Sequence, residues 1–409
     1  MTDLLIKNAK LLCIDGILRI KDILIENDKI KSIQNCIKIN DYDEIFNANK
    51  NIIIPSGIDT NVHISNIENK NEWYNCSCSA ASGGFTTIIN QQNENYFVSN
   101  KKSFDIINNY AKSKSIIDYI INVGFSGNIN DIYTLNNEEI FGIGEIPIEK
   151  YTLNLKEYIL EIRKQNLIFC IHTENNPQHK NNTFSNIYQL IKDEIYNIEK
   201  LNHFFKVNNN IKNYKKNTKL HFCSIYTEKL LEYIIHQKYI SSYKITCETS
   251  PYQLFLDQSN KSINETKYFI NNLNNIDVIS SGSSIKNESF YLQDFSMLEI
   301  TIPLMLYAVH KNYTTLSNVI RLTSYNPSKI FNIKNKGLIQ INYDADLLIY
   351  NPKNIQKIKA ENFISNCEWT PYENMNCIFP EATISRGKII FIDKQIVYKK
   401  GRGHLIQRG

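Results

Sequence analysis

The stretch Ile52-Ile53-Ile54-Pro55-Ser56-Gly57-Ile58-Asp59-Thr60-Asn61-Val62-His63 decides the fold. Its apolar run, bounded by proline and glycine, is typical of a buried strand. The strand ends in Asn61-Val62-His63, whose first and third residues share one face. A His-x-His pair in that position would present both imidazoles to one metal site, but an amide is a poor substitute for imidazole at zinc. We therefore interpret the stretch as the first strand of a barrel, ending in an altered metal motif.

The size and composition of the chain set limits on its class. Its 409 residues suffice for a barrel of roughly 250 residues with a smaller domain. No window offers the roughly 20 apolar residues that cross a bilayer, and the N-terminus lacks a signal-peptide pattern. Nine cysteines without a CxxC pair favour reduced thiols in the cytoplasm. The net charge of +5 comes from dispersed lysines, so we expect neither nucleic acid nor a membrane as a partner.

The pattern of short strands divides the chain into two units. Residues 1–54 and 333–409 carry strand-like runs separated by turn signals such as Asp15-Gly16 and Asn27-Asp28. We expect these two ends to form one composite β-sandwich domain. In residues 55–332, apolar strands alternate with helical patterns such as Leu155–Gln165 and Thr227–Gln237, as in a (β/α)8 TIM-type barrel. The expected strands after the first are Thr86–Asn90, Tyr119–Gly124, Ile168–His172, Lys219–Ile225, Tyr243–Glu248 and Ile276–Ser281.

Several motifs, in this order, resemble the dihydroorotase branch of the amidohydrolase superfamily, which also includes dihydropyrimidinase and allantoinase. The resemblance extends over nearly the whole chain. It rests on Ile54–His63, Ala80–Thr87, Ile171–Asn175, Ile245–Leu254, Asn326–Phe331, Asp344–Ile349 and Cys367–Glu373. The fold that this resemblance implies is the amidohydrolase barrel with a small β-sandwich built from both termini.

The resemblance also implies a binuclear zinc site, in which the metals activate a bridging water and an aspartate moves the proton. Two of the six expected positions remain, as His63 and His172. The other four ligand positions are replaced. The first histidine is Asn61, the bridging lysine is Gly144 (Gly142 in the other register), the fourth histidine is Ser224 and the aspartate is Gly282.

Other residues near these positions receive separate interpretations. The arginine that would clamp the substrate carboxylate is Ser65, whereas the substrate-binding asparagine is retained as Asn93. Glu145 is a candidate replacement ligand, although it should point away if Gly144 points inward. We expect His221 and Cys223 to face away from Ser224, and therefore from the site, because strand side chains alternate.

Two functions remain open from the sequence. In the first, a dihydroorotase-like protein of pyrimidine biosynthesis has lost binuclear-zinc hydrolysis, binds zinc weakly or not at all, and acts as a noncatalytic homologue. Its partners would be further copies of itself and aspartate carbamoyltransferase. In the second, an active dihydroorotase or related cyclic amidohydrolase uses a reduced metal site on His63 and His172. We favour the first, because lysine-to-glycine and aspartate-to-glycine exchanges run against the A/T-rich drift that the Lys/Asn/Ile composition indicates.

Overall fold

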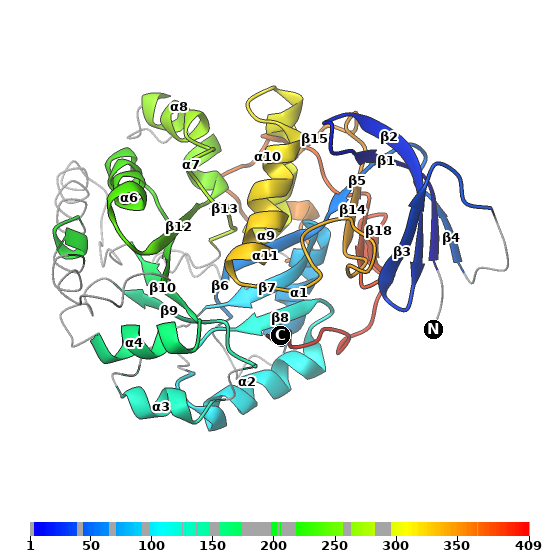
Figure 1. Cartoon of the computed structure of the whole chain (residues 1–409). Coiled ribbons are helices and arrows are strands. Elements are labelled where there is room, and N and C mark those ends of the chain that lie inside the picture. Colours follow the sequence, from blue (N-terminus) through cyan, green and yellow to red (C-terminus); the bar gives the residue numbers. More distant parts are fainter. Residues whose placement is uncertain are drawn as a thin grey trace.

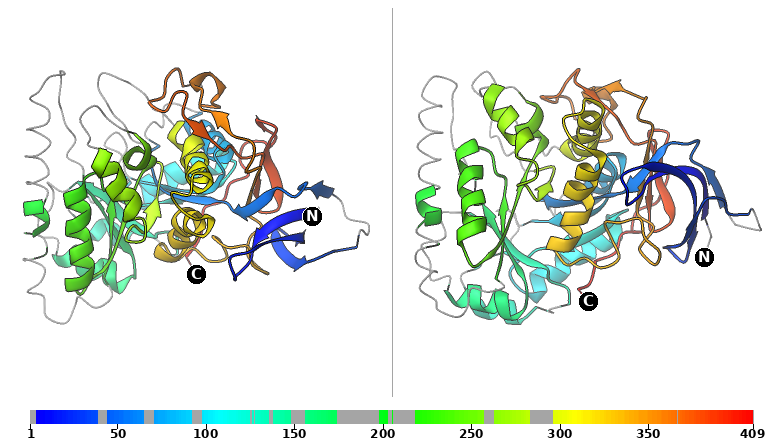
Figure 2. Two further views of the ribbon diagram at one scale, coloured as in Figure 1. Left: turned by 90° about the horizontal axis from the view of Figure 1, so that it is seen from above. Right: turned by 45° about the horizontal axis from the view of Figure 1, so that its top comes forward.

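A computed structural model of the chain (Figures 1 and 2) describes most of the sequence. The described residues are 4–38, 44–64, 71–91, 98–124, 126, 128–135, 138–147, 156–173, 198–202, 205, 218–256, 263–282, 296–365 and 367–408. Asn93, Ser65 and part of the Ile171–Asn175 motif therefore lie outside the described residues.

Eight parallel strands follow one another in chain order around the centre of the molecule. They form a three-stranded and a five-stranded sheet, which a parallel bridge between Val123 and Ile143 links. At the other end of the order, the backbone N–H of Ser281 donates to Oδ2 of Asp59, at 2.9 Å. The strands are β6 Gly57–Val62, β7 Phe85–Asn90, β8 Asp118–Ile121, β9 Gly142–Pro147, β10 Ile168–His172, β11 Lys219–Cys223, β12 Lys244–Thr249 and β13 Val278–Ile279.

Helices cover the outside of these strands, as Figure 1 shows, and several begin at capping residues that the sequence supplies. Asn100 and Thr227 each accept a hydrogen bond from a backbone N–H of the first turn of α2 and α6. No described helix is both long and apolar enough to cross a membrane. The helices are α1 Glu72–Ser82, α2 Lys101–Lys114, α3 Ile129–Tyr133, α4 Lys156–Lys164, α6 Glu228–Ile240, α7 Pro251–Phe255, α8 Ile263–Asn271, α9 Ser296–His310, α10 Leu316–Ile320 and α11 Asn326–Ile330.

A nine-stranded sheet, the terminal sheet, joins the two ends of the chain beside the barrel (Figure 1). Its order is β19-β18-β17-β14-β5-β1-β2-β3, with β4 also paired to β1. The central neighbours β5 and β14 come from opposite ends of the sequence and pair antiparallel. The strands are β1 Leu4–Leu12, β2 Leu18–Glu26, β3 Lys29–Gln34, β4 Glu44–Asn47, β5 Ile52–Pro55, β14 Leu347–Tyr350, β17 Ala382–Ser385, β18 Lys388–Ile392 and β19 Gln395–Ile396; a separate pair is β15 Gln356–Lys357 with β16 Asn376–Cys377.

A buried ion cluster fastens the barrel to the terminal sheet. Nζ of Lys336 lies 2.8 Å from Oδ2 of Asp118, the first residue of β8, and 2.5 Å from Oδ2 of Asp346, which precedes β14. Asp344 contributes a third carboxylate at 3.3 Å, and Arg386 approaches Asp118 at 3.2 Å. Burial disfavours the charge on Lys336, but the three carboxylates outweigh it and raise its pKa. The cluster explains why the Asp344-Ala345-Asp346 motif carries charge directly before a buried strand.

The mixed α/β fold predicted from the sequence is confirmed, and most barrel strands lie within two residues of their expected bounds. Ile168–His172 is β10 without change, and helix α4 starts one residue after the expected Leu155. At the N-terminus, residues 4–12 form one strand, β1, with a bulge between Ile6 and Ala9 at Asn8, whose φ of 57° asparagine tolerates.

Candidate active site

Asn61, at the end of β6, links three elements of the barrel. Its Nδ2 donates to Oε1 of Glu248 on β12 at 2.7 Å and to Oγ of Ser224, directly after β11, at 3.4 Å. Its Oδ1 lies 2.9 Å from Nε2 of His63. Asn61 and Glu248 are buried, at 1% and 0% exposure. The structure therefore brings together three of the six sequence-predicted positions, Asn61, His63 and Ser224, through hydrogen bonds.

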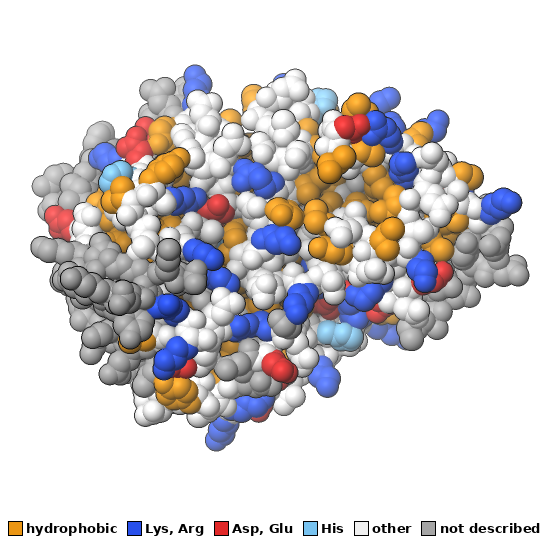
Figure 3. All heavy atoms as spheres, viewed as in Figure 1, with side chains coloured by type: hydrophobic (Ala, Val, Ile, Leu, Met, Phe, Trp, Pro, Cys, Tyr) orange, Lys and Arg blue, Asp and Glu red, His pale blue; other side chains and the backbone are white. Residues whose placement is uncertain are grey.

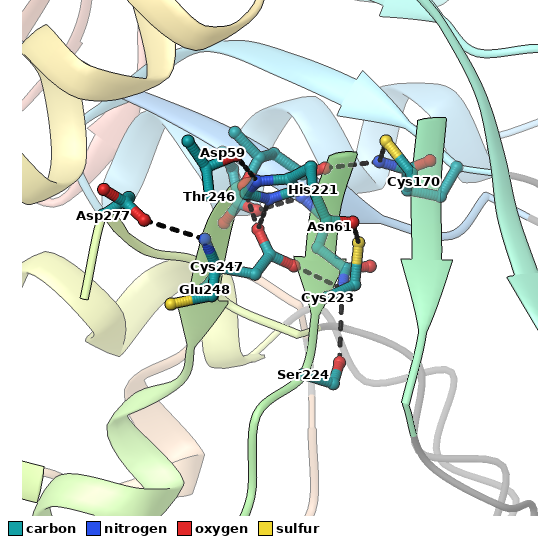
Figure 4. A network of polar contacts seen from close by, with 12 residues as sticks. Asp59, Asn61, Cys170, His221, Cys223, Ser224, Thr246, Cys247, Glu248 and Asp277 are labelled. Atoms are coloured by element: carbon teal, nitrogen blue, oxygen red, sulfur yellow. Dashed lines mark hydrogen bonds and ion pairs between the residues drawn. The ribbon is translucent and has the colours of Figure 1, made fainter. Parts of the chain in front are cut away.

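Glu248 is the centre of a buried polar cluster that we call the Glu248 network: Glu248, Thr60, Asn61 and His221 (Figure 4). The Thr60 hydroxyl and the Asn61 amide donate to its two carboxylate oxygens. Nε2 of His221 lies 3.1 Å from Oε2. A buried carboxylate needs such partners, because an unpaired one would be strongly destabilising. These partners hold the Glu248 carboxylate in one orientation.

The alternation of strand side chains predicts that His221 and Cys223 face away from the site. In the structure, both residues instead lie beside Glu248. The ligand atoms of His221, Cys223 and Glu248 all lie within 4.8 Å of one another. Ser224, one residue further on, nevertheless reaches Asn61. The alternation fails because β11 ends at Cys223 and Ser224 adopts a left-handed backbone with φ of 56°. His221 and Cys223 thus lie beside Glu248, and Ser224 from the same segment contacts Asn61.

Asp59 adds a second buried carboxylate beneath the strand ends. Its Oδ1 accepts from the backbone N–H of Asn61 at 3.0 Å, and its Oδ2 from that of Ser281 at 2.9 Å. Burial raises the pKa of Asp59 to about 7; the nearby charge of Glu248 adds to the rise, and the two hydrogen bonds oppose it. Asp59 thereby holds the end of β13 against β6.

Amide side chains continue the polar interior toward the next strands. Nε2 of Gln91 donates to the carbonyl of Thr60 at 2.8 Å, and Nδ2 of Asn122 donates to Oε1 of Gln91 at 3.0 Å. The sulfur of Cys170 on β10 lies 3.7 Å from Nδ2 of Asn122. These contacts connect β6, β7, β8 and β10 below the strand ends, so the interior of the barrel is fixed by polar contacts as well as by apolar packing.

Gly144, the expected position of the bridging lysine, has a backbone that excludes side chains. Its φ is +127°, and a Cβ there would lie 2.3 Å from the carbonyl oxygen of Cys170. Its own N–H donates to the carbonyl of Val123, at 2.8 Å, at the junction of β8 and β9. Gly142, the other register, is also buried, and its Cβ would meet the Ile168 carbonyl at 3.0 Å. The side chain of Glu145 lies outside the described residues.

Gly282 and His172 complete the expected set. Gly282, at the expected aspartate position, has φ of +60°, and among the described residues a Cβ there would have only Ser250 within 4 Å, at 3.6 Å. His172 is the last residue of β10 and is half-buried. Its backbone pairs with Cys223 of β11 and with Pro147 of β9. Both residues lie at strand ends, where the sequence predicted them.

The donor atoms at these positions do not fit a binuclear zinc centre. Zinc requires imidazole, thiolate or carboxylate ligands. Asn61 turns an N–H donor toward Glu248, Ser224 is a hydroxyl acceptor for that amide, and Gly144 cannot carry a bridging group.

Glu248 is the residue that sequence reasoning missed, although it lies within a motif used for the resemblance. The sequence did carry a signal. Within Ile245–Thr249, Glu248 is an acidic residue among uncharged ones in a strand. Buried acids of this kind require partners and so mark polar sites. His221, two residues before the end of its strand, carries the same signal.

Comparison with known proteins gives a consistent result. Residues 52–390 match the sequence pattern described as the Amidohydrolase family. The chain is 31% identical to a dihydroorotase of Methanosarcina acetivorans, with 100% of the chain and 96% of the relative covered. It is also 31% identical to a dihydroorotase of Methanosphaera stadtmanae, with 98% of each covered.

Solved structures share the fold. The L-hydantoinase (dihydropyrimidinase) from Arthrobacter aurescens superposes with a TM-score of 0.83 at 20% identity, covering 100% of both chains. The dihydropyrimidinase from Brevibacillus agri gives a TM-score of 0.79 at 18% identity, covering 98% of both. These structures confirm the amidohydrolase barrel with its β-rich domain.

Proposed function

The chain belongs to the Amidohydrolase family, and from this premise we propose that it is a dihydroorotase-like protein of pyrimidine biosynthesis that has lost binuclear-zinc hydrolysis of the cyclic amide. In this role it acts in the cytoplasm as a noncatalytic homologue and partner. The single observation that carries the proposal is the backbone at Gly144. A bridging ligand cannot be supplied there without rebuilding the contact between β9 and β10.

The Glu248 network supports the same proposal. In it, the amide of Asn61 donates to Glu248, and it also donates to the hydroxyl of Ser224. A metal-bound water needs open coordination positions and a group that accepts its proton. At the aspartate position, Gly282 offers no proton acceptor. Loss of the bridge, of two histidines and of the aspartate removes each part of that chemistry.

The partners that we propose are further copies of the chain and aspartate carbamoyltransferase. Support for a protein partner comes from the β1–β2 hairpin, whose exposed apolar side chains are Ile14, Ile17, Leu18 and Ile20. Figure 3 shows hydrophobic side chains gathered over the region of β1 and β2. Contiguous exposed apolar surface of this kind is typical of interaction sites.

One experiment tests the proposal. Purified protein is assayed for the interconversion of N-carbamoyl-aspartate and dihydroorotate, and zinc is measured on the same sample. We expect no activity above background and no zinc pair. Turnover that His63→Ala abolishes would show that the proposal is wrong, and would establish the alternative of an active enzyme with a reduced site on His63 and His172. The 31% identity to dihydroorotases over the whole chain favours testing that alternative directly.

A second measurement addresses the partner role. The full chain is mixed with aspartate carbamoyltransferase from the same source and analysed by size-exclusion chromatography with light scattering. A complex that Ile17→Lys weakens, while Ile106→Lys on α2 does not, supports the proposed interface. Both residues are exposed, at 55% and 37%, so neither change should affect folding. Absence of a complex and of self-association would refute the partner role.

A further inference from the structure

We propose that His221, Cys223 and Glu248 form a single-metal site for a borderline divalent cation such as Zn²⁺, relocated from the family positions. The three ligand atoms lie within 4.8 Å of one another, and all three residues are fully buried. None of the three occupies a position at which the resemblance places a metal ligand. Imidazole, thiolate and carboxylate together are a donor set that zinc prefers.

The hydrogen bonds around His221 hold its ring toward Glu248. The Thr246 hydroxyl lies 2.9 Å from Nδ1 of His221 and 3.3 Å from the carbonyl oxygen of Leu220. Nε2 of His221 lies 3.1 Å from Oε2 of Glu248. In the tautomer whose Nδ1–H donates to Thr246, the lone pair of Nε2 and the Glu248 carboxylate face each other, and one metal ion can bind both.

The spacing of the donor atoms suits a metal ion. In tetrahedral zinc with bonds of about 2.0–2.1 Å, nitrogen and oxygen ligands lie about 3.3 Å apart. The observed 3.1 Å between His221 and Glu248 is close to this value. Cys223 follows His221 by two residues on β11, and its sulfur completes the group. Three protein ligands leave the fourth position of the ion for a water molecule.

The surrounding residues supply the orientation that metal ligands require. Thr246 contacts Nδ1 of His221 and orients the ring, and Asn61 and Thr60 hold the Glu248 carboxylate. Such outer contacts orient ligands at known metal sites, and losing one costs about 10–100-fold in metal affinity. Asn61, which stands where the resemblance implies a histidine, therefore has a role at the proposed site, because its amide donates to the ligand Glu248. The loss of the binuclear site and the new site are two aspects of one arrangement.

Metal content and cobalt spectroscopy on the full-length protein test this inference. We expect about one zinc per chain after dialysis against metal-free buffer, because structural zinc is bound tightly. Cobalt exchanged for zinc should show the near-ultraviolet absorption of a thiolate-to-cobalt bond. Both signals should be lost in Cys223→Ala and retained in Cys170→Ala, which changes a buried cysteine on the neighbouring strand β10. Thr246→Val should weaken zinc affinity by about 10–100-fold while leaving all three ligands in place.

The alternatives give different results. Zinc that depends on His172 and survives His221→Ala would place the metal at the family positions and overturn the inference. A protein without stoichiometric zinc, or a cobalt spectrum unchanged by Cys223→Ala, would overturn it as well. Because the cobalt spectrum is recorded on the unmodified protein, a variant that fails to fold cannot obscure the result. Hydrolysis of dihydroorotate is measured separately, so failure of this inference and failure of the proposed function are distinguishable.

Discussion

The amide nitrogen of Asn61 lies 2.7 Å from a carboxylate oxygen of Glu248, across the interior of the barrel from β6 to β12. The contact places a hydrogen-bond donor at the position where the resemblance implies a metal ligand, and it joins β6 to an acidic residue of β12. Its energetic weight, and that of three other features, can be measured.

Asn61→Ala should lower the free energy of unfolding by about 1.5–3 kcal/mol, since it removes a donor to a buried charged acceptor. The measurement is urea denaturation at pH 7 followed by circular dichroism. Asn376→Ala is the matched control, because its amide donates to the Tyr307 hydroxyl in an exposed contact. That change should cost within about 0.5 kcal/mol. Equal costs for the two variants would contradict a special role of Asn61.

Gly144→Ala should be more destabilising than Gly282→Ala, although both glycines have positive φ. At Gly144 the new Cβ would collide with the Cys170 carbonyl, so we expect a loss of at least about 3 kcal/mol or failure to fold. At Gly282 only the left-handed backbone is unfavourable, at about 1–2 kcal/mol. Soluble yield and thermal melting compare the two. A Gly144→Ala protein as stable as the wild type would remove the main support for the noncatalytic proposal.

Lys336→Met should cost about 3–5 kcal/mol, because it removes the cation that contacts both buried carboxylates, Asp118 and Asp346. Lys29→Met is the control. Lys29 also contacts Asp344, at 2.7 Å, but its side chain is 44% exposed, and such pairs are worth up to about 1 kcal/mol. Guanidinium denaturation of both variants gives the comparison. A cost below about 1 kcal/mol for Lys336→Met would show that the cluster does not fasten the two units.

Stability should fall in acid partly through Asp22. Burial opposes ionisation of this carboxyl, but hydrogen bonds from Lys7 at 2.5 Å and from the N–H groups of Ile37 and Asn8 outweigh it and lower its pKa. The stabilisation is fully present above the unfolded pKa of about 3.9 and is lost as the pH falls through the lower folded value. Asp22→Asn should therefore be less stable at pH 7 and show a shallower loss of stability below about pH 4.

Melting temperatures recorded from pH 2.5 to 7 measure this effect, with Asp15→Asn as the control. Asp15 pairs with Arg19 on the surface, where both side chains are more than 40% exposed. Its replacement should leave the acid profile unchanged within error. Parallel profiles for wild type and Asp22→Asn would contradict the assignment.

Much of the fold followed from local pattern. An apolar run located β10, because burial on both faces of a strand leaves a continuous apolar signal. Apolar residues at helical spacing located α4. The bulge at Asn8 could not be predicted, since positive φ at one asparagine has no periodic signature. The order of the terminal sheet also depends on contacts between the two ends of the chain, which local pattern does not encode.

The candidate site was predictable at its strand ends and not between them. Asn61, Ser224 and Gly282 lie where the motifs placed them, but the partners of Asn61 depend on which side chain of β12 points inward. The orientation of Cys223 was missed because the left-handed backbone of Ser224 ends the alternation early. A side chain does not fit at Gly144 because the carbonyl oxygen of Cys170 is too close. This contact joins two separate strands, and sequence spacing does not reveal it.

The pairing of β5 with β14 has a consequence for synthesis of the protein on the ribosome. Ile54 pairs with Leu348, so β5 has no neighbour on that side while most of the barrel is being made. At about 5–20 residues per second, the roughly 290 intervening residues take about 15–60 s. During that time an apolar strand edge is open to other nascent chains. We therefore expect chaperones, and the speed of translation near the C-terminus, to affect the yield of folded protein more than its final stability.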